Sequence, residues 1–240
     1  MATLPRISTD DLPDEERTVA LALIEALGDD LAALVWQGSW ARGEANPESD
    51  HDLVVIMRRL DEELLRTIAG VFRGRPVKWS TYIKTEEELR QYPAHGRLQF
   101  LHGVRLIHGD FEPPPVTRAN LLEDLRHIAN DIEHETRYRL VHRDLSTRPA
   151  FETARDGRLL YYWSKVLLLS LKAREILRGR YYPVTRADLR ACLSDTDELA
   201  LLDIIERWPD LRPEYERDFT PLGLLVDRVV RKLVSELPPQ

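Results

Sequence analysis

The sequence predicts an α/β (α+β) domain with a mixed β-sheet over residues 1–112, followed by an all-α helical-bundle domain over residues 117–240. In the first part, short apolar runs alternate with amphipathic segments, which is typical of a sheet covered by helices. In the second part the strand signals stop, and segments with apolar residues at helical spacing follow. Between the parts, three consecutive prolines (Pro113–Pro115) make a stiff joint, because proline can continue neither a helix nor a central strand.

The first part is expected to hold four strands and three helices. Its first helix begins with acidic residues and ends at Gly28, where a C-cap is expected. The strands are short runs rich in apolar residues, which indicates that they are buried. We expect helices at 14–28, 60–72 and 86–91, and strands at 31–37, 52–57, 77–83 and 104–108.

The second part is expected to form a bundle of four or five helices joined by short connections. The last helix carries a stripe of apolar residues on one face: Leu222, Leu225, Val226, Val229, Val230 and Leu233. The expected helices are 120–141, 151–178, 186–193, 195–208 and 220–237.

The composition is that of a globular protein and excludes several classes. The 240 residues are 43% hydrophobic and 31% charged, which supplies a buried core and does not suggest disorder. No apolar run approaches the roughly 18 residues of a membrane span, and the acidic start lacks the apolar stretch of a signal peptide. The single cysteine, Cys192, cannot form an internal disulfide. We therefore expect a cytoplasmic protein with no membrane partner.

The net charge of −7 lies entirely in the first half of the chain. Residues 1–116 hold 13 lysines and arginines against 20 aspartates and glutamates, whereas residues 117–240 hold 21 of each. An acidic half binds duplex nucleic acid poorly and suits a divalent metal ion or a cationic small substrate better. The alternative is a solvated acidic surface that only keeps the chain soluble.

Residues 38–42 carry groups that suit a phosphate. A predicted strand ends at Gly38, which lets the backbone turn tightly and approach a ligand closely. Ser39 offers a hydroxyl and an N–H group to a phosphate oxygen. Arg42 adds a planar cation whose shape matches phosphate.

Asp50 and Asp52 stand two residues apart where the next strand begins. In a strand such residues point to the same face, about 6.6 Å apart along the chain. Two carboxylates at this spacing can share Mg²⁺, which prefers oxygen ligands together with substrate phosphates. His51, between them, points the other way, so we expect it to pack rather than to react.

This stretch resembles the signature of the nucleotidyltransferase superfamily, the polymerase-β-like fold, in which Gly-Ser and a spacer precede Asp-x-Asp on a strand. Residues 38–43 and 49–53 look especially like the small prokaryotic branch with the aminoglycoside and minimal nucleotidyltransferases. Members of that branch often carry a C-terminal helical domain. The sequence-specific resemblance covers residues 31–57.

The resemblance implies a reaction and a set of site residues. The reaction is Mg²⁺-dependent transfer of a nucleoside monophosphate, AMP from ATP, to a hydroxyl of a small-molecule or protein acceptor, with release of pyrophosphate. A cationic, aminoglycoside-like acceptor suits the acidic first part. In relatives a lysine of the helical domain reaches the nucleotide phosphates. The implied residues are Asp50 and Asp52 for catalysis and metal binding, and Gly38, Ser39, Arg42 and Lys165 for nucleotide binding.

The sequence departs from the family pattern at the third carboxylate, which lies on a later neighbouring strand in relatives. The strand expected at 77–83 has no acidic residue, and Lys78 or Ser80 takes that position. A carboxylate from elsewhere can substitute; the candidates are Glu44, Glu86, Asp110, Asp131, Glu133 and Glu135. The alternative function is a catalytically impaired module of the same fold that binds a nucleotide or a partner in a regulatory, antitoxin-like role.

A third hypothesis concerns the helical part. Arg137 and His142 have the Arg-x4-His spacing of a class of helical-bundle ribonucleases (HEPN domains) that often accompany such nucleotidyltransferases. In a chain with 34 lysines and arginines and seven histidines, this spacing also arises by chance. Loss of RNA cleavage on substitution of either residue would be needed to keep the hypothesis.

Overall fold

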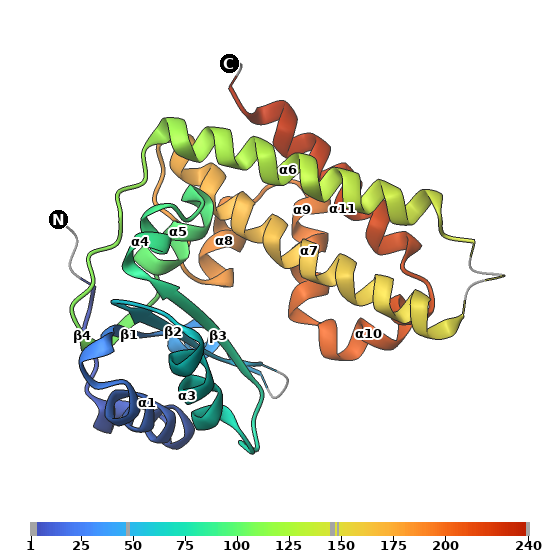
Figure 1. The fold of residues 1–240 in the computed structure, drawn as a ribbon. Coiled ribbons are helices and arrows are strands. Elements are labelled where there is room, and N and C mark those ends of the chain that lie inside the picture. The colour runs from blue at the N-terminus through green and yellow to red at the C-terminus, as the bar shows by residue number, and fades with distance from the viewer. Residues whose placement is uncertain (1–3, 47–48, 145–146, 148, 239–240) are drawn as a thin grey trace. The chain divides into compact units, whose positions relative to one another are not determined.

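The computed structural model describes residues 4–46, 49–144, 147 and 149–238. The chain divides into two compact units, residues 1–116 and residues 117–240, and the division falls directly after the three prolines. Figure 1 traces the strands and the helices of both units.

The first unit is built on a four-stranded mixed sheet with the strand order β3-β2-β1-β4. β1 pairs in antiparallel fashion with both β2 and β4, while β2 and β3 run parallel. The predicted mixed sheet is therefore confirmed. The strands are β1 (Leu31–Gln37), β2 (His51–Met57), β3 (Trp79–Thr85) and β4 (Arg105–Gly109).

Helices cover both faces of this sheet. Along β2, Leu53 and Val55 join the core formed with α1 and α3, whereas Val54 and Ile56 join the core that contains Leu89 of α4. This alternation follows from the period of two in a strand, and it assigns a face to every residue of β2. The helices of this unit are α1 (Asp14–Leu27), α2 (Gly38–Ala41), α3 (Glu62–Phe72), α4 (Glu86–Arg90) and α5 (Ala94–Leu101), with short 3₁₀ turns at Thr9–Asp11 and Gly28–Asp30.

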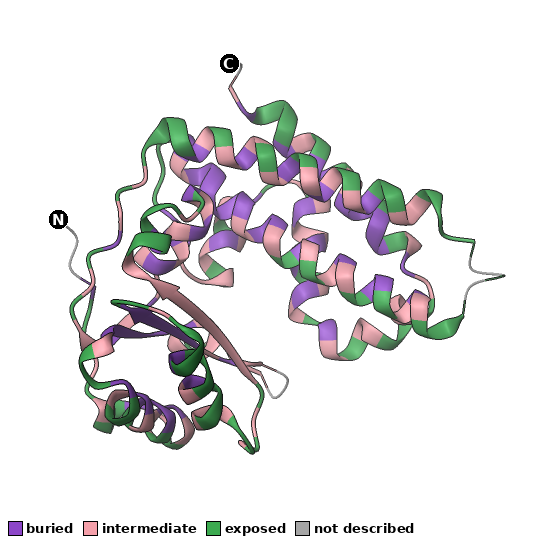
Figure 2. Ribbon diagram, in the orientation of Figure 1, coloured by how far each residue is buried: buried purple, intermediate pink, exposed green. Residues whose placement is uncertain are grey.

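Burial differs between the central strands and the edge strand. Figure 2 shows β1 and most of β2 buried, whereas β3 is of intermediate exposure along its whole length. Among the described strands β3 is an edge strand of the sheet, and every one of its side chains keeps some exposure. Polar residues at the start of β3 can therefore contact a ligand.

The second unit is all-helical, as expected, with six helices among its described residues rather than four or five. The additional helix is α10, which follows α9 almost without a break. Trp208 starts it and stacks on Tyr161 of α7, with ring centroids 3.9 Å apart. The helices are α6 (Arg118–Val141), α7 (Ala150–Leu177), α8 (Arg186–Cys192), α9 (Thr196–Glu206), α10 (Trp208–Arg217) and α11 (Thr220–Glu236).

The apolar stripe of α11 is buried as its spacing predicts, and α11 packs against α6 and α7. A buried ion network also joins helices of this unit. Arg174 of α7 donates to both carboxylate oxygens of Glu198 on α9, at 2.6 and 3.1 Å, and to Glu236 of α11 at 2.8 Å. Because Arg174 and these two partners come from three different helices, the network specifies how α7, α9 and α11 pack together. None of the helices in the described part of the chain has both the length and the apolar character of a membrane-spanning segment.

Candidate functional site

The backbone bends sharply where β1 ends. Gly38 has a φ of +82°, in the region that favours glycine, and starts the single turn of helix α2. The Trp40 ring of this turn stacks on His51 at the start of β2, with centroids 4.8 Å apart and ring planes 15° apart. The bend is thus anchored on the neighbouring strand.

The bend and the second aspartate lie in direct contact. Gln37, the last residue of β1, is paired with Asp52 in the antiparallel ladder. A Cβ atom added to Gly38 would stand 1.9 Å from Oδ2 of Asp52, so only a glycine leaves room for this carboxylate. The Gly-Ser bend and the Asp-x-Asp strand therefore form one site, with Asp52 against the backbone of Gly38.

His51 points to the opposite face of the sheet, as predicted. Its ring is buried between Trp40 and Trp79, and its Nδ1 lies 2.8 Å from Oε1 of Glu16 on α1. Glu16 is fully buried. Its contact with His51 was not predicted from the sequence. A signal was present, because Glu16 stands one helical turn before Val19 on the buried stripe of α1.

Asp50 lies just before β2 and is paired with a lysine of the neighbouring strand segment. The Nζ atom of Lys78 donates to Oδ1 of Asp50 at 2.6 Å. Ser80 is the register partner of Asp52 in the parallel ladder. The family pattern places a third carboxylate at Lys78 or Ser80. These two residues lie beside Asp50 and Asp52, and they carry an ammonium and a hydroxyl instead.

Arg42 makes an ion pair within the site's own loop. Its Nε donates to Oε2 of Glu44 at 2.8 Å, and both side chains are largely buried. The N–H of Glu44 in turn donates to the carbonyl oxygen of Ser39 at 2.8 Å. Arg42 is therefore positioned beside the Gly-Ser bend, and its guanidinium carries further N–H donors besides the Nε that contacts Glu44.

Glu86 and Asp110, the other candidate carboxylates of the first unit, lie at the end of the sheet opposite Asp52. Glu86 follows Thr85, which is paired with Met57 at the opposite end of β2 from Asp52. Asp110 follows Gly109, whose partner is Ala33, and forms an exposed ion pair with Arg6. Asp131, Glu133 and Glu135 belong to α6 in the second unit. Glu44 is thus the one of these candidates that lies on the loop of the site.

Asp50 and Asp52 form a two-carboxylate donor set. Within the described ranges, no group of three or more histidine, cysteine, aspartate or glutamate side chains is arranged to hold a metal ion. Two carboxylate side chains are nevertheless the ligand type that Mg²⁺ takes alongside substrate phosphates and water. The residues present fit one such ion bound together with a phosphate ligand.

Two lysines of α7 in the second unit have different environments. Lys165 is exposed, and its ammonium lies 5.4 Å from the centroid of the Tyr161 ring. Lys172 is buried and donates to the carbonyl oxygen of Val184 at 2.6 Å, so its role is structural. The assignment of Lys165 to the nucleotide remains a prediction.

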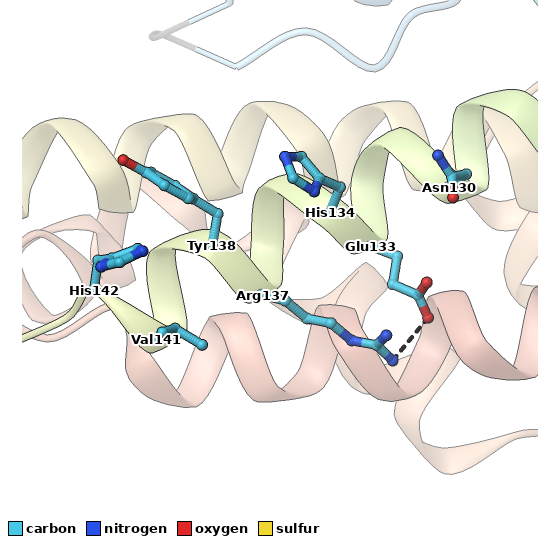
Figure 3. Close-up of a pocket in the computed structure, with 7 residues that line it drawn as sticks. All are labelled: Asn130, Glu133, His134, Arg137, Tyr138, Val141 and His142. Carbon is cyan, nitrogen blue, oxygen red and sulfur yellow. Dashed lines mark ion pairs between the residues drawn. The ribbon is translucent and has the colours of Figure 1, made fainter.

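A shallow pocket of about 370 Å³ lies along the C-terminal half of α6 and contains both residues of the Arg-x4-His pair. Figure 3 shows Arg137 pointing away from His142 and toward Glu133. Arg137 is held by Glu133 at 2.7 Å and by Asp227 at 2.8 Å, and the His142 ring packs 4.7 Å from that of Tyr138. The two residues thus line one pocket but are engaged in separate contacts, and the ribonuclease hypothesis stays a prediction.

Comparisons with known proteins give one family and one fold. The model of the nucleotidyltransferase domain family matches residues 20–160. The structure is similar to a crystal structure of spectinomycin adenyltransferase AAD(9) from Enterococcus faecialis with ATP and spectinomycin. The TM-score is 0.54 at 10% sequence identity, and the match covers 92% of this chain and 98% of that one. A comparison with curated protein sequences finds no match.

Proposed function

Because the chain belongs to the nucleotidyltransferase domain family, we propose that this enzyme transfers AMP from ATP to a hydroxyl group of a small molecule. The acceptor oxygen forms a bond to the α-phosphorus. The bond between this phosphorus and the oxygen that bridges to the β-phosphate breaks, pyrophosphate leaves with that electron pair, and the hydroxyl proton is released to water. The observation that supports the assignment best is the contact between the Gly38 backbone and the Asp52 carboxylate.

The Gly-Ser bend is the proposed phosphate-binding element. Gly38 lacks a side chain at the point where the backbone must stand close to Asp52, and this leaves the main chain open to a ligand. Ser39 supplies a hydroxyl and an N–H group, and Arg42 supplies a guanidinium that forms paired hydrogen bonds to phosphate oxygens. Glu44 keeps Arg42 beside the bend before the nucleotide arrives.

Asp50 and Asp52 are the proposed metal ligands. They project from one face of the sheet beside the bend, and carboxylates of this kind hold Mg²⁺ together with phosphate oxygens. Bound there, Mg²⁺ would neutralise charge on the leaving pyrophosphate and polarise the α-phosphate. Asp50 and Asp52 would hold this ion, and the Gly38 backbone keeps Asp52 in place.

We expect a cationic acceptor of the aminoglycoside type. Residues 1–116 carry an excess of seven acidic groups, which attracts a polycation at moderate ionic strength. The similar adenyltransferase structure was determined with ATP and the aminocyclitol spectinomycin, which supports a small-molecule acceptor bearing hydroxyl and amino groups.

The test is pyrophosphate release from ATP with Mg²⁺ and a panel of aminoglycoside, aminocyclitol and neutral polyol acceptors. We expect turnover with a cationic acceptor and a loss of about a hundredfold or more in kcat/KM for Asp50→Asn and Asp52→Asn. Asp110→Asn is the matched control, since Asp110 is exposed at the end of the sheet opposite Asp52 and should keep full activity. Unchanged activity in both site variants would remove Asp50 and Asp52 from the mechanism.

A catalytically impaired binding module is the second candidate. It is favoured by one observation, the presence of Lys78 beside Asp50 where relatives carry a further carboxylate. This candidate predicts that the chain binds an ATP analogue with micromolar or tighter affinity and shows no turnover with any acceptor in the panel. Acceptor-dependent pyrophosphate release would exclude it.

A further inference from the structure

We propose that the Lys78 ammonium stands in for a second divalent cation, so that Asp50 and Asp52 hold a single divalent ion together with the nucleotide. This inference rests on the proposed nucleotide site and concerns how its charge is balanced. The starting point is the 2.6 Å contact between Nζ of Lys78 and Oδ1 of Asp50.

The position of Lys78 is set by the main chain as well as by this contact. Its carbonyl oxygen accepts a hydrogen bond from the N–H of His51 at 2.9 Å, which continues the parallel ladder by one residue. The register pairs His51 with Trp79 and Asp52 with Ser80, so Lys78 stands beside Asp50. Because side chains alternate along both strands, Asp50, Asp52, Lys78 and Ser80 share one face of the sheet.

The lysine covers one side of the first aspartate. The side chain of Asp50 is 25% exposed, whereas that of Lys78 is 77% exposed, so the ammonium lies between this carboxylate and solvent. A divalent ion cannot take the same lone pair of Oδ1 while the ammonium donates to it. We expect the second oxygen of Asp50 and the carboxylate of Asp52 to be the protein ligands of that single ion.

The local charge also argues against two divalent ions. Lys78 brings one positive charge to Asp50, and Arg42 brings one to the nearby Glu44. The affinity of a carboxylate site for a divalent cation increases with the number of charged ligands. A site with this charge is suited to one divalent ion, whose remaining ligands come from the triphosphate and water.

The ammonium can serve a bound triphosphate directly. A lysine has three N–H donors on a flexible stem, so Lys78 can keep Asp50 as one partner and donate to a phosphate oxygen with another. Lys78 would then neutralise negative charge that develops on the phosphate oxygens, in the position that a second divalent ion would otherwise occupy. Lys78 is in this sense a proposed catalytic residue.

The decisive measurement is the number of Mn²⁺ ions bound per chain in the presence of saturating α,β-methylene-ATP, whose α–β linkage is not cleaved. Free Mn²⁺ is followed by electron paramagnetic resonance with the full-length protein. We expect one Mn²⁺ per chain in the wild type and two in Lys78→Asp, which supplies a third carboxylate. Lys84→Asp is the control and should bind one, since Lys84 lies on β3, about 20 Å along the chain from Lys78.

Two outcomes would overturn the inference: two Mn²⁺ ions in the wild type, or one in Lys78→Asp. Binding of the analogue is measured on the same samples by equilibrium dialysis. Failure of the wild type to bind the analogue would overturn the proposed function and this inference together. Binding of the analogue with two Mn²⁺ ions in the wild type would overturn this inference alone.

A second variant tests the ammonium without adding an acid. Lys78→Gln should weaken binding of the analogue in Mg²⁺ by about tenfold, because a charge-assisted contact to phosphate is lost. Lys84→Gln should bind like the wild type, and equal melting temperatures of the two variants would show that both are folded. Unchanged affinity in Lys78→Gln would contradict a contact between Lys78 and the triphosphate.

Discussion

Gly38 meets two separate demands at the centre of the site. Its φ of +82° favours glycine, and the space that a side chain would need is filled by the carboxylate of Asp52. A residue with a Cβ atom must therefore strain the backbone and also displace the proposed metal ligand. The cost of the positive φ and the cost of the contact with Asp52 can be separated by comparison with a glycine that has a positive φ but open space around an added Cβ.

We predict that Gly38→Ala destabilises the protein by about 2 kcal/mol or more and weakens binding of an ATP analogue at least tenfold. The positive φ alone costs about 1 kcal/mol for alanine. The control is Gly74→Ala, since Gly74 has a φ of +73° and no atom within 4 Å of an added Cβ. Urea unfolding and analogue titration measure the two effects. Equal losses in both variants would show that the contact with Asp52 carries no cost.

Among the helices, the network around Arg174 is the clearest case of charge placed inside a packed core. Its side chain is 3% exposed, and its carboxylate partners come from α7, α9 and α11. Burial by itself would lower the pKa of Arg174. The hydrogen bond and charge of Glu198, together with the charges of Glu236 and Glu175, outweigh burial, so the pKa of Arg174 is raised and the guanidinium stays charged.

We predict that Arg174→Met lowers the free energy of unfolding by about 3–5 kcal/mol, because the buried Glu198 loses its hydrogen bonds at 2.6 and 3.1 Å and keeps Lys232 at 3.7 Å. Methionine keeps much of the side-chain volume, so the loss reports the missing charge rather than a cavity. Arg190→Met is the comparison. Arg190 pairs with Asp203 and Glu206 at the surface, where such pairs contribute at most about 1 kcal/mol. Urea unfolding that gave the same loss for both would contradict this account.

Across the whole chain, the two units balance charge in different ways. Residues 1–116 carry the entire net charge of −7, whereas residues 117–240 are neutral and rich in specific ion pairs. In the second unit a hydrogen bond from Lys232 lowers the pKa of Asp195, and one from Arg228 lowers the pKa of Asp197. Stability in this unit should therefore depend on pH in the acid range.

We predict that the unfolding free energy of the chain decreases as the pH falls below about 4. A carboxyl group whose pKa is lower in the folded state than in the unfolded state stabilises the fold above its unfolded pKa. That contribution is lost as the pH falls through the folded value. Urea unfolding followed by far-UV circular dichroism between pH 7 and pH 3 measures the slope. Arg228→Met should flatten it by removing the partner of Asp197, and an unchanged slope in that variant would contradict the assignment.

The elements follow the sequence closely where local pattern is enough. β1 has the predicted bounds, and α1 and α3 begin and end within two residues of the expected positions. The sequence did not predict α5 and α10, because their local signals are weak. α5 is short and has Gly96 in its interior, while α10 contains Pro213, and both depend on tertiary packing, of Phe100 and of Trp208 respectively.

The features of the candidate site also fall into two groups, those that local sequence predicts and those that depend on tertiary packing. The amino-acid sequence by itself determined the Gly-Ser bend and the inward-facing His51, because each depends on a turn residue or on the alternation of side chains within one strand, and by the same alternation it predicts that Asp50 and Asp52 face the same way. Only the tertiary structure decided that Gly38 lies against Asp52, that Lys78 pairs with Asp50 and that Glu16 meets His51. Lys78 and Asp50 are 28 residues apart, and their contact exists because β3 pairs with β2 in one particular register. Strand register is set by packing over the whole sheet, and for that reason short-range pattern cannot specify it.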